Sequence, residues 1–221
     1  MVAMAASTAG SAAPALVPVT VRDLCVTEGE VTPLEAGRLA VDSPKMRATV
    51  NHGTRQLIEA RFTYLGATLH DVPLGSGQMR RQFGLKLEAG DPCNLLYVMW
   101  RFEPEAKIVV SVKRNDGAHT STACGNRGYE NVKPRRAAPV PRLEPGDTRT
   151  LRAELDGAVM RVFIDEAPVW EGGVGAAASG FDGPVGMRSD NARLAVALRA
   201  GPPLEGAKGR PRACAAPGNS D

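Results

Sequence analysis

The 221-residue sequence lacks the features that identify membrane proteins and zinc proteins. It contains no run of about eighteen apolar residues, so we predict no transmembrane span. Its histidines, His52, His70 and His119, lie far apart, and its four cysteines form no CxxC pair. We therefore predict no metal site, and we expect each histidine to lie in a surface loop.

The sequence also has few aromatic residues and little clustering of charged residues of one sign. The formal net charge is +3, and aromatic residues make up 5% of the chain. Nucleic-acid-binding proteins typically carry clustered basic residues, whereas the Lys and Arg residues here are scattered. We predict no nucleic-acid partner, although a pI near 8.8 is compatible with another kind of acidic partner.

The sequence is, however, rich in turn-forming and strand-forming residues. It contains 24 Gly and 17 Pro residues, and 43% of it is hydrophobic, which suffices for one packed core. We predict an all-β protein with a single antiparallel two-sheet sandwich over residues 16–200. Residues 1–15 are expected to form a flexible tail or the remnant of a signal peptide, and residues 201–221 a loose tail.

The segment RAELDGAVMRVFIDEAPVWEG, residues 152–172, is the strongest indication of β-structure. It predicts three short strands joined by tight turns at Asp156-Gly157 and Asp165-Glu166. The proline-broken segment 133–145 predicts a surface crossover loop. Further strands are predicted where apolar and polar residues alternate, in segments 38–42, 45–50, 56–66, 79–90, 94–102, 107–115 and 183–200.

The even number of cysteines allows two disulfides. Cys93 begins a predicted strand, and Cys124 follows the strand that pairs back along it, so the hairpin brings these two residues together. Cys25 and Cys214 would then join the two ends of the chain. Disulfides persist in oxidising surroundings, so we expect an extracellular or periplasmic protein; the alternative is four free, buried cysteines in a cytoplasmic protein.

The strand–turn pattern of residues 152–172, followed by GPVGMRSDNARLAVAL, resembles the second half of a concanavalin A-like or laminin G-like jelly roll. The similarity extends from about Gly37 to Arg199 and is nearest to the bacterial 3-keto-disaccharide hydrolase-like group. It implies two packed antiparallel sheets. Trp100 and Trp170 are expected to pack in the core, as large aromatic residues usually do; the alternative for Trp100 is a place in a ligand groove. The resemblance also raises the alternative of a calcium ion at Asp165 or Asp190, although the sequence contains no dense Asp/Asn cluster to hold one.

The resemblance raises the question of catalysis, which the sequence does not support. Glycosidases need two carboxylates that face one sugar, and enzymes of this fold usually place them along one strand as E-x-D-x-E. No such run occurs, and PLGSG at 73–77 is not the nucleophile motif G-x-S-x-G. These absences favour a protein that is not an enzyme and that uses no cofactor.

The alternating segments also predict a polar sheet face that points away from the core. Its members are Glu59, Arg61, Gln82, Lys86, Tyr97, Arg101 and Lys113. Tyr97 is placed to stack on a sugar ring, and Arg101 and Lys113 to hold hydroxyls or an anionic substituent. The alternative is an ordinary solvated face, which antiparallel sheets commonly have.

Three functions follow from these observations. The leading hypothesis is an exported, non-catalytic β-sandwich that binds carbohydrate or another cell-surface polymer through the polar face. The second is a glycan-acting hydrolase of the 3-keto-disaccharide hydrolase type, with Glu59 as the one carboxylate on that face. The third is a purely structural surface protein with no small ligand.

Overall fold

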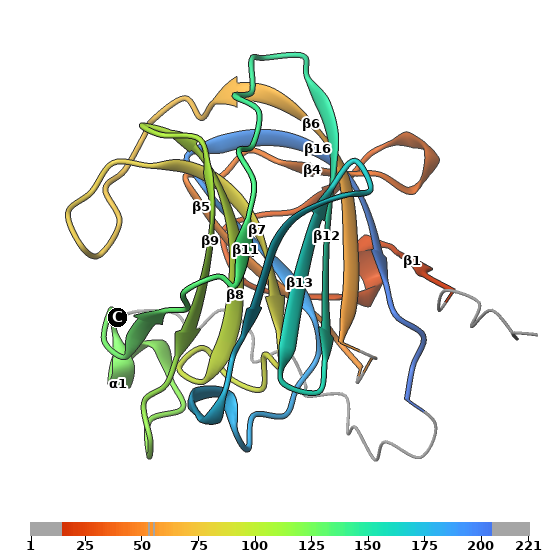
Figure 1. The fold of residues 1–221 in the computed structure, drawn as a ribbon. Coiled ribbons are helices and arrows are strands. Elements are labelled where there is room, and N and C mark those ends of the chain that lie inside the picture. The colour runs from red at the N-terminus through yellow and green to blue at the C-terminus, as the bar shows by residue number, and fades with distance from the viewer. Residues whose placement is uncertain (1–14, 53, 55, 205–221) are drawn as a thin grey trace, which may run out of the picture.

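The computed structural model describes residues 15–52, 54 and 56–204, which form two antiparallel β-sheets packed face to face (Figure 1). In the first sheet the strand order is β11 (Arg136–Ala137), β14 (Ala167–Gly173), β13 (Val159–Ile164), β12 (Thr148–Asp156), β6 (Leu57–Ala67), β16 (Ala192–Ala200), β4 (Leu39–Val41) and β3 (Thr32–Pro33), with β1 (Val17–Val19) paired to β16. In the second sheet the order is β10 (Tyr129–Asn131), β9 (Lys107–Lys113), β8 (Leu95–Glu103), β7 (Arg81–Leu87), β15 (Gly186–Asp190), β5 (Lys45–Val50) and β2 (Leu24–Glu28). The predicted antiparallel sandwich is confirmed.

Both predicted turns of the segment 152–172 are present, the first of them at Gly157 and Ala158, because Asp156 is the last residue of β12. Gly157 has a φ of 56° between β12 and β13, a left-handed conformation that glycine adopts without strain. Asp165 and Glu166 have φ values of 48° and 70° between β13 and β14, so both central residues of this turn are left-handed. Such turns match the twist of the strands that they join.

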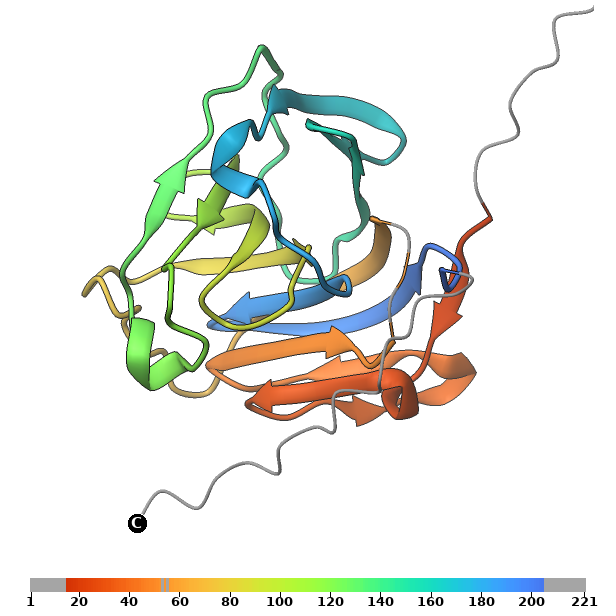
Figure 2. The ribbon, with the colours of Figure 1, turned by 90° about the horizontal axis from the view of Figure 1, so that it is seen from below.

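The termini of the sandwich meet in space. β16, near the end of the described chain, pairs with β1 and β4 as well as with β6. Figure 2 shows these N-terminal strands, in red and orange, beside the C-terminal strands in blue. The sequence did not predict β1, β2 or β3, and most of each expected tail lies outside the described residues.

The core between the sheets contains an aromatic cluster that crosses from one sheet to the other. Phe62 of β6 lies 4.9 Å from Phe83 of β7 and 5.8 Å from Trp100 of β8, measured between ring centroids. Trp100 is fully buried and Trp170 is 4% exposed, so the prediction that both are core residues is confirmed. Aromatic pairs of this kind add to the stability that burial itself provides.

The Cys93–Cys124 disulfide is present, with the two Cα atoms 5.8 Å apart. Cys124 ends the short helix α1 (Ser121–Cys124), which the sequence did not predict and which packs against the start of β8. No cysteine in the described part of the chain is free. Cys214, the proposed partner of Cys25, lies outside the described residues.

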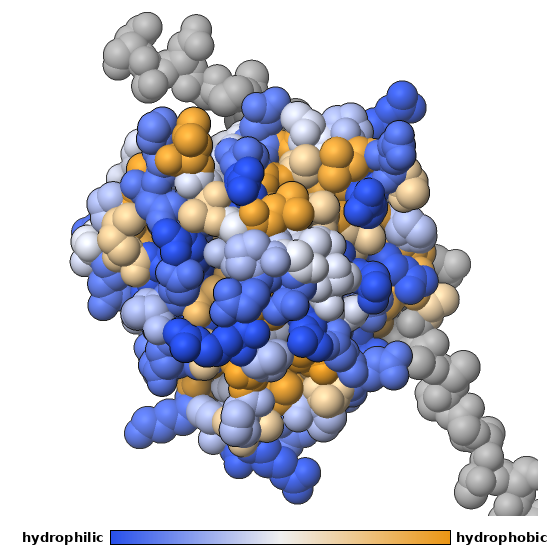
Figure 3. Space-filling view, turned by 90° about the horizontal axis from the view of Figure 1, so that it is seen from above, coloured by the Kyte–Doolittle hydropathy of each residue, from blue (hydrophilic) through white to orange (hydrophobic). Residues whose placement is uncertain are grey.

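The remaining described helices are single 3₁₀ turns at Val21–Asp23, Glu35–Gly37 and Ala176–Ala178. Within the described ranges, no helix has the length and hydropathy needed to cross a membrane. The segment 133–145 connects β10 of the second sheet to β12 of the first, so the predicted crossover loop is confirmed, with β11 inside it. Seen from above, hydrophobic surface residues form small patches separated by hydrophilic ones (Figure 3).

Candidate functional site

The outer face of the second sheet carries most of the predicted site residues in neighbouring register. Tyr97 of β8 pairs with Lys86 of β7, and Arg101 pairs with Gln82. Lys113 at the end of β9 pairs with Leu95 and with Tyr129 of β10. The alternation of these strands therefore predicted the outward direction of these side chains correctly.

Glu59 and Arg61 lie elsewhere, and their assignment to this face was wrong. Both residues belong to β6 in the first sheet, whose outer face is on the opposite side of the sandwich. Glu59 forms an ion pair with Arg199 at 3.7 Å, and Arg61 is exposed. Alternation along a strand separates inward from outward positions, but it does not reveal in which sheet the strand lies.

The outer face of the second sheet is also far less solvated than expected. Gln82 is 2% exposed, Tyr97 4% and Lys113 4%, because neighbouring side chains fold over one another. A Cβ atom at Gly84 would lie 2.5 Å from Sδ of Met99, so glycine at this position lets Met99 lie across β7. These side chains form a polar layer over the sheet rather than separate groups in water.

Asp190 organises this layer. It is completely buried and accepts hydrogen bonds from Gln82 Nε2 at 2.7 Å, Arg188 Nε at 2.9 Å and Arg47 at 3.0 Å. Burial raises the pKa of Asp190, but the charges of Arg188 and Arg47 outweigh this effect and hold the pKa below its usual range.

These contacts do not fit calcium. Calcium requires six or more oxygen ligands, whereas both carboxylate oxygens of Asp190 are bound by Arg and Gln donors. The other predicted candidate, Asp165, bonds to Arg149 and to the backbone N–H of Thr150. In the part of the chain that the structure describes, no three His, Cys, Asp or Glu side chains gather into a metal-binding group.

Lys86 lies in the same layer and is 5% exposed. Its amine has no hydrogen bond or ion pair with the described residues. Burial, together with the nearby charges of Arg47, Arg188 and Lys113, lowers the pKa of Lys86 to about 7, against a weaker opposite effect of Glu28. Lys86 is therefore a buried cationic group without a counter-ion in contact.

Two tyrosines and two cations form the other end of the layer. The ring of Tyr97 stacks on that of Tyr129 at 5.9 Å, and the Arg188 guanidinium lies 5.1 Å from the centroid of Tyr97. Lys113 donates to the carbonyls of Pro92 and Gly125 at 3.0 and 2.9 Å, which occupies its amine. Tyr129, at 40% exposed, is the aromatic ring of this group that a ligand can reach.

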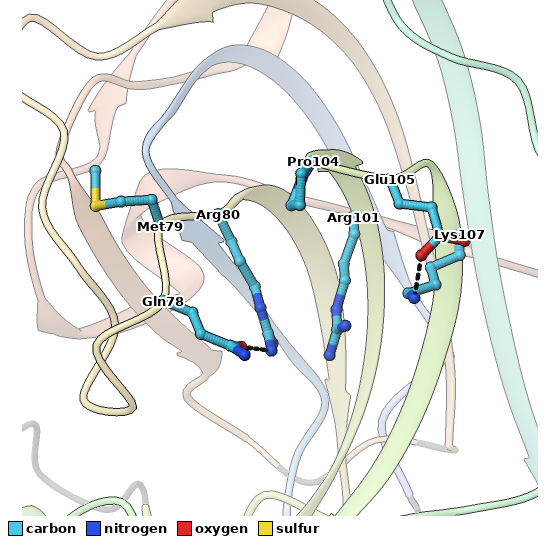
Figure 4. A pocket seen from close by; sticks show the side chains of 7 residues that line it. All are labelled: Gln78, Met79, Arg80, Arg101, Pro104, Glu105 and Lys107. Carbon is cyan, nitrogen blue, oxygen red and sulfur yellow. Dashed lines mark hydrogen bonds and ion pairs between the residues drawn. The ribbon is translucent and has the colours of Figure 1, made fainter.

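At the opposite end of the face, a pocket of about 290 Å³ opens beside the β8–β9 hairpin (Figure 4). It is lined by Gln78, Met79, Arg80, Arg101, Pro104, Glu105 and Lys107. Arg101 is the sequence-predicted site residue in this lining. Figure 4 shows the Arg80 and Arg101 side chains extending side by side in the same direction.

The segment that supplies Arg80 is held in place from two sides. Asn191, fully buried in the turn between β15 and β16, donates to the carbonyls of Val72 and Arg80 at 2.8 and 3.0 Å. Arg81 pairs with Asp71 at 2.7 Å and also with Glu103. These contacts anchor both ends of the 72–80 loop, so the backbone of Arg80 is positioned by residues outside the pocket.

Sequence reasoning did not include Arg80, Tyr129 or Asp190 in the polar face. Arg80 falls within the predicted strand segment 79–90 but precedes β7, and Tyr129 lies in a strand of three residues, too short for alternation to be visible. Asp190 was considered only as a calcium ligand, beside the predicted turn at Asn191. The three histidines contribute nothing to the pocket, and His119 instead lies 2.8 Å from Asp91 near the disulfide.

No family model matches this chain, and no curated protein matches it in sequence. Solved structures share its fold. The carbohydrate-binding module CBM66 from Bacillus subtilis is 14% identical, with a TM-score of 0.52 over 79% of this chain and 92% of the module. A structure from work on endo-acting O-glycanases that human gut bacteria express to initiate mucin breakdown is 11% identical, with a TM-score of 0.50 over 84% of this chain and 93% of its own. At these identities the similarity shows the jelly-roll fold alone.

Proposed function

We propose that the protein is an exported, non-catalytic β-sandwich that binds carbohydrate or another cell-surface polymer. The polymer lies against the outer face of the second sheet, between the Arg80–Arg101 pocket and the exposed ring of Tyr129. Arg101 is six residues from Leu95, the β8 partner of Lys113, so this face extends for about 20 Å along the strand. That length suits an extended polymer rather than a single small molecule.

One observation carries this proposal: the outer face ends in a pocket whose cationic donors are not all used by the protein. The Arg101 side chain lines the pocket and forms no hydrogen bond or ion pair with a described residue, and its buried Nε atom is among the unpartnered donors. Tyr129 offers a half-exposed ring that Tyr97 and Arg188 hold in place. An aromatic ring and planar donors along one sheet are the groups that sugar recognition uses.

The carboxylates near the pocket support a binding role rather than hydrolysis. Glu105 forms an ion pair with Lys107, and both carboxylate oxygens of Asp190 are bound by arginine and glutamine side chains. A two-carboxylate mechanism needs two acids that face one substrate, and the pocket lining contains one. The fold shared with a carbohydrate-binding module and the Cys93–Cys124 disulfide support binding outside the cytoplasm.

A glycan array with the purified protein tests the proposal. We expect binding to a defined subset of glycans and loss of that binding in Arg101→Ala and Tyr129→Ala. Arg61→Ala is the matched control, because it removes the same charge from an exposed position on the opposite face. The proposal fails if no glycan or cell-surface polymer is bound, or if Arg61→Ala reduces binding as much as Arg101→Ala does.

A further inference from the structure

The pocket at the end of the outer face carries positive charge that the described protein does not balance. Its lining contains three cations, Arg80, Arg101 and Lys107, and one carboxylate, Glu105. Glu105 forms its ion pair with Lys107. Neither Arg80 nor Arg101 has a carboxylate of a described residue within ion-pair distance, and Arg80 bonds instead to the neutral amide of Gln78.

The two unbalanced guanidinium groups lie beside each other. Burial lowers the pKa of Arg101, and the neighbouring charge of Arg80 lowers it further, against a weaker opposite effect of Glu105. Burial also lowers the pKa of Arg80, where the charge of Arg188 adds to the effect and Asp190 opposes it more weakly. An anion between the two guanidinium groups would attract both of them and so offset the repulsion between their like charges.

The backbone geometry keeps these groups together rather than letting them separate in solvent. Arg101 projects from the middle of the second sheet, where β8 pairs with both β7 and β9. Arg80 follows a loop whose ends are bound by Asn191. A site whose donors are placed before the ligand arrives loses less conformational freedom on binding.

From this geometry we infer that the pocket is an anion subsite for an acidic substituent, a carboxylate or a sulfate ester, on the bound glycan. Arg80 and Arg101 donate to its oxygens, because planar guanidinium groups match such oxyanions in paired hydrogen bonds. Met79 and Pro104 supply apolar surface at the same pocket for the carbon skeleton that bears the anion. This inference rests on the proposed glycan-binding function and specifies which glycans are bound.

Three polymers with one backbone test the inference: dextran, carboxymethyl dextran and dextran sulfate. We expect the full-length protein at about 0.15 M salt to bind one or both charged polymers more tightly than dextran. Arg80→Ala and Arg101→Ala should each weaken that binding roughly 10-fold or more, since hydrogen bonds to charged groups are the strong ones. Arg101→Lys keeps the charge but loses the planar donors, so an intermediate loss is expected.

Arg61→Ala is again the control, with an expected change of less than about twofold, and thermal melting verifies that every variant is folded. The charged polymer that responds more strongly to Arg101→Ala identifies the substituent as carboxylate or sulfate. Equal binding of all three polymers by the wild type overturns the inference. Equal losses in Arg61→Ala and Arg101→Ala also overturn it, because they indicate general attraction to a basic protein.

A second measurement separates this inference from the proposed function. Sodium glucuronate and sodium sulfate are titrated separately into ¹⁵N-labelled protein, and the Nε–Hε resonances of arginine are followed. Saturable changes in the chemical shifts of the Arg80 or Arg101 Nε–Hε group, without binding of any polymer, would support the anion subsite and refute glycan binding. Glycan-array binding restricted to neutral glycans, with no such shifts, would support the function and refute the subsite.

Discussion

Lys86→Met is expected to stabilise the protein, and to do so more at neutral and acidic pH than at alkaline pH. The Lys86 amine is buried beside Arg47, Arg188 and Lys113 and has no counter-ion in contact. Methionine keeps the unbranched apolar stem, which packs in the layer, and removes the charge. The variant therefore removes the energetic penalty of burying the ammonium group while preserving most of the packing.

The size and sign of the effect follow from the pKa. A pKa lowered from 10.5 to about 7 corresponds to ~5 kcal/mol against the charged form in the folded state, at about 1.36 kcal/mol per pH unit. Below pH 7 the amine is protonated in both the folded and the unfolded protein, so the wild type carries the full penalty. Between pH 7 and 10.5 the unfolded state binds more protons, so wild-type stability rises with pH.

The difference between Lys86→Met and wild type in the free energy of unfolding should therefore be largest below pH 7 and shrink toward pH 10.5. Urea denaturation at several pH values between 6 and 10 measures it. Tyr97, Lys113 and the arginines of the layer are common to both proteins, so their titrations largely cancel in the difference. Lys133→Met, at an exposed position in the crossover loop, is the control. A Lys86→Met difference that does not change with pH would refute the reasoning.

Three further outcomes test the rest of the structure. Trp100→Ala should cost about 3–5 kcal/mol because the ring is fully buried; a variant with wild-type stability in urea would show that Trp100 is not in the core. Replacing Cys93 and Cys124 together by Ser should cost about 3–4 kcal/mol for a disulfide between residues 31 positions apart, and detection of both thiols in the oxidised wild type by non-reducing peptide mapping would contradict the pairing. Burial, with a contribution from Asp182, raises the pKa of Glu88 to about 7, so the wild type loses stability as the pH rises from 4.5 through 7. Glu88→Gln should therefore melt at a higher temperature than wild type at pH 8 but not at pH 4. If the difference in melting temperature between the two proteins is the same at both pH values, the raised pKa of Glu88 is refuted.

The sequence by itself was sufficient to predict the local structure and the class of fold. Period-two alternation identified the main strands of both sheets, and Asp156-Gly157 and Asp165-Glu166 identified two turns, because these features depend on residues close together in the chain. The burial of Trp100 and the pairing of Cys93 with Cys124 followed from the same hairpin. Each of these predictions needs only the geometry of neighbouring strands.

The candidate site was decided by tertiary structure. A sandwich has two outer faces, and alternation does not distinguish them, so Glu59 and Arg61 were assigned to the face opposite their own. Burial of the polar layer could not be predicted either, because Asp190 binds Gln82 through the pairing of β15 with β7, and these two residues are 108 positions apart in the sequence. Which distant strands become neighbours depends on the packing of the whole core, and that packing places Asn191, between β15 and β16, where it donates to the Arg80 carbonyl beside the pocket.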